Sequence, residues 1–107
     1  MTRVALLGMT AFLAACNASA APPTPAKTEV VIANYRFVPA TLTVAAGTTV
    51  TWINNDDDAH TVMDAAGEFR SGALDQSQSY AFTFVKAGIY RIGCSMHPQM
   101  SETIIVQ

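Results

Sequence analysis

The chain has 107 residues, of which 50% are hydrophobic and 13% are charged, and its formal net charge is -2. This length allows one domain with a small core, and the apolar content is too high for a disordered chain. No cluster of lysine and arginine occurs, so the sequence predicts no nucleic acid partner.

Residues 1–20 have the pattern of a signal peptide. Arg3 gives a basic start, residues 4–15 are almost wholly apolar, and small residues follow. The apolar run is shorter than the roughly 20 residues that a membrane-spanning helix needs. Two processing routes remain open, lipidation of Cys16 after Leu-Ala-Ala and cleavage after Ala20. Both routes predict an exported, periplasmic protein, and lipidation would also anchor it to a membrane.

The remaining chain predicts a single all-β domain over residues 28–107, after a proline-rich spacer at residues 21–27. Short β-branched and aromatic runs alternate with glycine turns. The predicted strands are residues 28–33, 41–44, 48–54, 79–84, 89–94 and 102–107. No helical periodicity appears, and residues 68–78 are predicted to be irregular. These features indicate a β-sandwich, most simply of Greek-key type.

Alternation within two of these strands predicts which side chains fill the core. In residues 48–54, Val50 and Trp52 point to one face, as in a half-buried strand. In residues 79–84, the aromatic side chains of Tyr80, Phe82 and Phe84 share one face. We therefore expect these five side chains to pack inside the sandwich.

The most informative stretch is a run near the C-terminus with the spacing C-x-x-H-x-x-M, which contains Cys94, His97 and Met100. A thiolate and a thioether on either side of an imidazole favour copper. The only other histidine is His60, which follows the predicted strand 48–54. Loops after neighbouring strands meet at an end of a sandwich, where functional sites are common. We therefore predict one copper site made by His60, Cys94, His97 and Met100.

Other roles for Cys94 remain open at this point. Lipidation or removal of Cys16 would leave Cys94 as the only cysteine of an exported protein. A buried structural cysteine, a disulfide between the two cysteines, and a zinc site are the alternatives. Zinc sites rarely include methionine, so zinc explains the run less well than copper does.

Taken together, these motifs resemble the cupredoxins, the blue-copper family, and are most similar to its amicyanin and plastocyanin branch. The resemblance covers about residues 28–107. It rests on Val-Thr-Trp-Ile-Asn at residues 50–54, Ala-Gly-Ile-Tyr at residues 87–90, and the short ligand loop at residues 94–100. The two-residue gap between His97 and Met100 is what points to that branch.

The resemblance implies a trigonal ligand set of the Nδ1 atoms of His60 and His97 and the thiolate of Cys94. It also implies Met100 as a longer axial ligand. Such a site has no open position for a substrate, so we expect an electron carrier and not an enzyme.

Two positions depart from the family pattern. Thr61 stands where the family often has an asparagine that ties the two ligand loops together. A threonine hydroxyl could do part of that task, which predicts a differently tuned environment around the metal. Met96 stands where amicyanin-like loops tend to have proline, and it adds a sulfur atom beside the site.

The expected partners are redox proteins, such as a c-type cytochrome or a periplasmic dehydrogenase or oxidase. His97 is the predicted electron port, with Met96, Pro98 and Gln99 as an apolar docking surface. The acidic residues 56–58 would favour the more positive oxidation state of the metal and attract a basic partner, or they form a solvated loop without consequence. We expect a monomer.

Two other functions compete with electron transfer. A periplasmic copper chaperone or storage protein would use similar ligands but release the metal, and such sites are usually richer in methionine and histidine. A fragment of a multicopper oxidase or nitrite reductase would need further histidines for a second copper centre, and the sequence has none.

Overall fold

The computed structural model describes residues 27–107. The predicted signal peptide, with Cys16, and all but the last residue of the predicted spacer lie outside the described residues. The described part contains eight strands and no helix, and therefore no helix that could span a membrane. The strands are β1 (Lys27–Ala33), β2 (Arg36–Val38), β3 (Thr41–Val44), β4 (Thr48–Asn54), β5 (Met63–Asp64), β6 (Ser79–Phe84), β7 (Gly88–Gly93) and β8 (Ser101–Val106).

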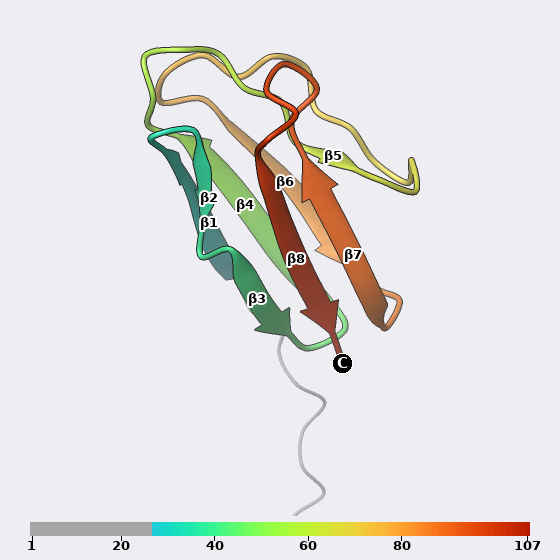
Figure 1. Cartoon of the computed structure of the whole chain (residues 1–107). Helices are drawn as coiled ribbons and strands as arrows, with labels where there is room; N and C mark the ends of the chain where they lie inside the picture. Colours follow the sequence, from blue (N-terminus) through green and yellow to red (C-terminus); the bar gives the residue numbers. More distant parts are fainter. Residues whose placement is uncertain (1–26) are drawn as a thin grey trace, which may run out of the picture.

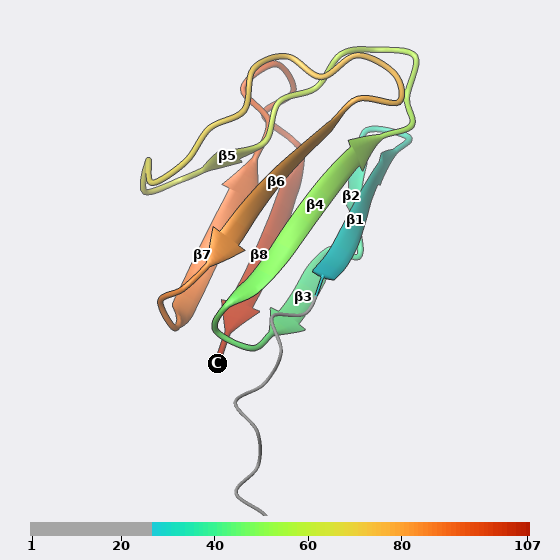
Figure 2. The same cartoon turned by 180° about the vertical axis from the view of Figure 1, so that it is seen from behind.

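Two four-stranded sheets pack face to face, which confirms the predicted β-sandwich (Figures 1 and 2). One sheet has the strand order β2-β1-β4-β6 and the other has the order β3-β8-β7-β5. Both sheets are mixed, because β1 pairs in parallel with β4, and β3 pairs in parallel with β8. These partners are far apart along the chain, so the connections cross between the sheets.

The sequence did not predict β2 or β5. β2 pairs antiparallel with β1 through a two-residue turn at Asn34 and Tyr35, whose φ angles are 53° and 59°. Such turns need positive φ at both positions and usually contain glycine, so Asn-Tyr gave no hairpin signal. β5 has only two residues, which is too short for any alternation to show.

The core confirms the predicted faces. Val50 and Trp52 of β4 and Phe84 of β6 have no exposed surface, while Tyr80 and Phe82 are partly buried against them. The Trp52 indole Nε1 donates a hydrogen bond of 2.8 Å across the sandwich to Oε1 of Glu102 on β8. The two sheets are therefore joined by a buried polar contact as well as by apolar packing.

The two connections that carry the predicted ligands lie at the same end of the sandwich. One connection joins β4 to β5 and the other joins β7 to β8, and both form the upper end of the molecule in Figure 1. The C-terminus lies at the opposite end. The topology therefore brings together segments that are more than 30 residues apart in the sequence, since Cys94 follows His60 by 34 residues.

Candidate metal centre

His60 is held rigidly from both its backbone and its ring. Its amide donates to the carbonyl of Leu74 at 3.1 Å, and the amide of Leu74 donates back at 2.7 Å. The side chain has no exposed surface. Nε2 of the ring lies 2.8 Å from Oδ2 of Asp56. When Nε2–H donates to this carboxylate, the neutral ring keeps its lone pair on Nδ1, the atom needed for metal binding.

Cys94 comes directly after β7 and is 5% exposed. Burial by itself would raise the pKa of this thiol. The hydrogen bonds that it receives from the Thr61 amide, from His97, from the Met96 amide and from the Thr61 hydroxyl outweigh burial, so the pKa falls from 9.0 to about 6. The site thus favours the thiolate, which is the form that binds metals.

Thr61 ties the two ligand loops together. Its amide lies 3.3 Å from Sγ of Cys94, and its hydroxyl oxygen accepts a hydrogen bond of 2.8 Å from the Ser95 amide. The same hydroxyl lies 2.9 Å from the Ser95 hydroxyl. The threonine therefore makes the link between loops that the asparagine of the family pattern was expected to make.

His97 and Met100 occupy the turn that follows Cys94. The Met100 amide donates to the His97 carbonyl at 3.0 Å, which closes the turn. The His97 side chain is half-buried, and Met100 is 3% exposed within the core cluster. The fold therefore brings Met100 to the buried side of the loop and leaves part of the His97 ring at the surface.

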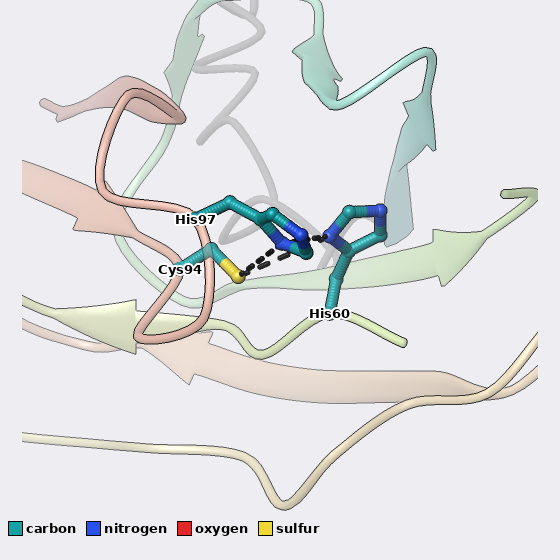
Figure 3. A group of neighbouring side chains, drawn as sticks. All are labelled: His60, Cys94 and His97. Carbon is teal, nitrogen blue, oxygen red and sulfur yellow. Dashed lines mark hydrogen bonds between the residues drawn. The ribbon is translucent and has the colours of Figure 1, made fainter. Parts of the chain in front are cut away.

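Three potential ligand atoms converge (Figure 3). The Nδ1 atoms of His60 and His97 are 3.0 Å apart, and Sγ of Cys94 lies 3.9 Å from the first and 3.7 Å from the second. A circle through three atoms at these separations has a radius of about 2.1 Å, which matches metal bonds to imidazole nitrogen and approaches those to thiolate sulfur. One ion near its centre would contact all three atoms after only a small outward shift of the sulfur.

The chemistry of these atoms narrows the class of site. Two imidazoles and one thiolate form a trigonal set, and Met100 adds a buried thioether at the end of the same loop, whereas Met96 is 51% exposed. This donor set is typical of blue-copper electron-transfer sites. A β-sandwich that holds it between two loops at one end is the architecture of a small copper protein.

Comparison with known proteins agrees with this class. Residues 3–106 match the family model of the cupredoxin-like domain, so the chain belongs to the cupredoxin family. The amicyanin of Paracoccus denitrificans is 36% identical over 81 residues, which cover 71% of this chain and 62% of that protein.

Solved structures show the same relationship. An amicyanin variant in the Cu(I) state has a TM-score of 0.71 at 31% identity, over 76% of this chain and 82% of that chain. A copper-containing nitrite reductase from Thermus scotoductus has a TM-score of 0.69 at 29% identity. The match covers 87% of this chain but only 24% of the reductase chain.

Two residues make contacts with the predicted ligands that the sequence did not predict. Asp56 was predicted only as one of three aspartates that act on the metal and a basic partner through their charge or form a solvated loop, but its carboxylate contacts His60 and accepts hydrogen bonds from the backbone amides of Asn34 and Tyr35. The Tyr35 ring packs against both histidines. Asp56 is more than 20 residues from Asn34 and Tyr35 in the sequence, and Tyr35 is more than 20 residues from either histidine. The only local signal was the spacing of four residues between Asp56 and His60.

Proposed function

We propose that this protein is a type 1 copper electron carrier and that His60, Cys94, His97 and Met100 hold one copper ion. The observation that supports this proposal best is the convergence of two imidazole Nδ1 atoms and one thiol at mutual distances of 3.0 to 3.9 Å. Met100 is assigned as the axial ligand from the family pattern, and its burial in the same core cluster as Cys94 is consistent with that role. When bound, copper supplies the one-electron couple between Cu(I) and Cu(II).

The protein's own contribution is a rigid and closed setting. His60 and Cys94 are both buried, and their hydrogen bonds with Asp56 and Thr61, respectively, fix the two side chains. With four protein ligands, no position remains for a substrate, which supports a carrier and not an enzyme. A setting that does not rearrange between oxidation states favours fast electron transfer. The same rigidity argues against a chaperone, which must open to release its metal.

Electrons would enter and leave through His97. Its ring is half-buried, whereas the ring of His60 is fully buried. Met96 beside it is 51% exposed, and Pro98 and Gln99 are also exposed. These three residues form a small surface on which a partner could bring its own redox centre close to the His97 ring.

The partner we propose is another redox protein, such as a c-type cytochrome or a periplasmic dehydrogenase or oxidase. Asp57 and Asp58 are exposed near the copper end and would attract a basic surface. Asp56 is not free for this purpose, because its carboxylate is engaged with His60 and the β1–β2 turn. We also propose export to the periplasm as a monomer, with membrane attachment if Cys16 is lipidated.

A spectroscopic titration tests the function. Cu(II) added to the metal-free protein should produce an intense visible sulfur-to-copper charge-transfer band that saturates at one equivalent of copper. Reduction should bleach the band reversibly. Cys94→Ser, which keeps the size of the side chain but removes the sulfur, should show no such band. If the wild-type protein bound copper without this band, or lost its copper at once to a weak chelator, the result would contradict the proposal and favour copper transport.

A further inference from the structure

A tyrosine outside the ligand set contacts both ligand histidines. The Tyr35 ring lies edge-on to the His60 ring, with 5.3 Å between centroids and an interplanar angle of 90°. Its centroid lies 5.0 Å from that of His97, at 74°. Edge-to-face contacts at these distances are favourable. One aromatic ring therefore touches imidazoles that come from two different loops.

The backbone of Tyr35 has an unfavourable conformation. Its φ angle of 59° lies in the left-handed region, which a bulky side chain seldom adopts. Asn34 before it, with φ of 53°, is a residue type that tolerates this region far better. A tyrosine at the second position of such a turn is therefore unusual, and the contacts of its ring offer a reason for it.

Two aspartates hold the turn in place. The amides of Asn34 and Tyr35 donate to the two oxygens of the Asp56 carboxylate at 2.6 and 2.9 Å. The phenol of Tyr35 donates to Asp58. Since Oδ2 of Asp56 also lies 2.8 Å from Nε2 of His60, one carboxylate fixes both the ligand and the turn that covers it.

We infer that Tyr35 is a positioning residue for the metal centre, an inference that rests on the proposed function. Its ring holds the His60 and His97 imidazoles with their Nδ1 atoms converged before any metal binds. Preorganised ligands lose less conformational freedom on binding, so the gain appears as metal affinity. The Tyr35 ring contacts both imidazoles while the residue is 41% exposed, so the ring lies between the imidazole pair and solvent on that side.

Three variants test this inference. Tyr35→Ala removes the ring, and Tyr35→Phe keeps the ring but removes the hydrogen bond to Asp58. Val38→Ala is the matched control, because Val38 lies on the same hairpin and is 51% exposed. For each variant we would record the NMR signals of the His60 and His97 rings in the metal-free protein. The Cu(I) affinity of each would be measured by competition with a chromogenic chelator.

We expect Tyr35→Ala to shift and broaden the signals of both imidazoles and to lower Cu(I) affinity about tenfold, since two aromatic contacts are lost. Tyr35→Phe and Val38→Ala should keep the ring signals and stay close to the wild-type affinity. If Tyr35→Ala keeps both imidazole rings as ordered as Val38→Ala does, the inference is overturned. A wild-type protein that bound no copper would refute the proposed function, while the metal-free NMR comparison would still decide the role of Tyr35.

Discussion

The buried carboxyl of Glu102 makes folding stability depend on pH. Glu102 is 2% exposed, its Oε1 accepts the Trp52 indole hydrogen bond, and its Oε2 has no hydrogen-bond partner among the described residues. Burial raises the pKa of this carboxyl from 4.5 to about 7, against a smaller lowering by the Trp52 hydrogen bond. The folded protein therefore prefers Glu102 protonated, whereas the unfolded chain ionises it readily above pH 4.5.

The sign and size of the effect follow from this difference. Because the pKa is higher in the folded state, the stabilisation is complete below the unfolded pKa of 4.5 and is lost as the pH rises through about 7. At 1.36 kcal/mol for each pKa unit, the free energy of unfolding should fall by about 3 kcal/mol over this range. Above pH 8 the loss from this group should be complete.

Glu102→Gln provides the assay. The amide oxygen can still accept the Trp52 hydrogen bond, but the side chain no longer ionises, and its unpaired amide group costs the same at every pH. Urea unfolding of the metal-free wild type and variant at several pH values between 4.5 and 8 gives the difference in stability. We expect the variant to gain about 3 kcal/mol relative to the wild type as the pH rises. A difference that stayed constant with pH would refute the reasoning.

Three further predictions concern the loops at the copper end. Thr61→Val removes the hydroxyl near the thiol, so the pKa of Cys94 should rise above about 6 in a thiolate absorbance titration of the metal-free protein. An unchanged pKa would show that this hydroxyl does not stabilise the thiolate. Met96→Lys should slow electron transfer to the physiological partner and leave the copper spectrum intact, and unchanged kinetics would exclude docking at this surface. Asp57→Asn should weaken the salt dependence of association with a basic cytochrome, with a change in rate below about tenfold. Association that was independent of ionic strength in the wild type would rule out this steering.

Much of the fold follows from alternation of side chains. β4 has the predicted limits, Thr48–Asn54, because buried side chains alternate with half-buried ones along its whole length, with Val50 and Trp52 on the buried face. β2 could not be predicted in the same way. It has three residues, and its pairing with β1 depends on a turn that is stabilised by Asp56 from a distant loop.

The residues of the candidate site also fall into a group that the sequence predicted and a group that it did not. His60, Cys94 and His97 were predicted from residue type and spacing, and the fold brings them together. Asp56 could not be distinguished from Asp57 and Asp58 in the sequence, since its contacts with Asn34 and Tyr35 arise only when the sheet forms. Tyr35 gave no signal, because edge-to-face packing against two loops leaves no local pattern in the sequence. Local spacing pointed to the candidate ligands, while the groups that support them depend on tertiary contacts.

The nearest neighbours of copper in the loaded protein test the central claim most directly. X-ray absorption at the copper edge should show one sulfur and two nitrogen atoms at about 2.0 to 2.3 Å, in both oxidation states and with little change between them. The Cys94→Ser protein should lose the short sulfur contribution. If the wild-type spectrum showed no short sulfur contact, or matched that of Cys94→Ser, the two loops would not form the proposed centre.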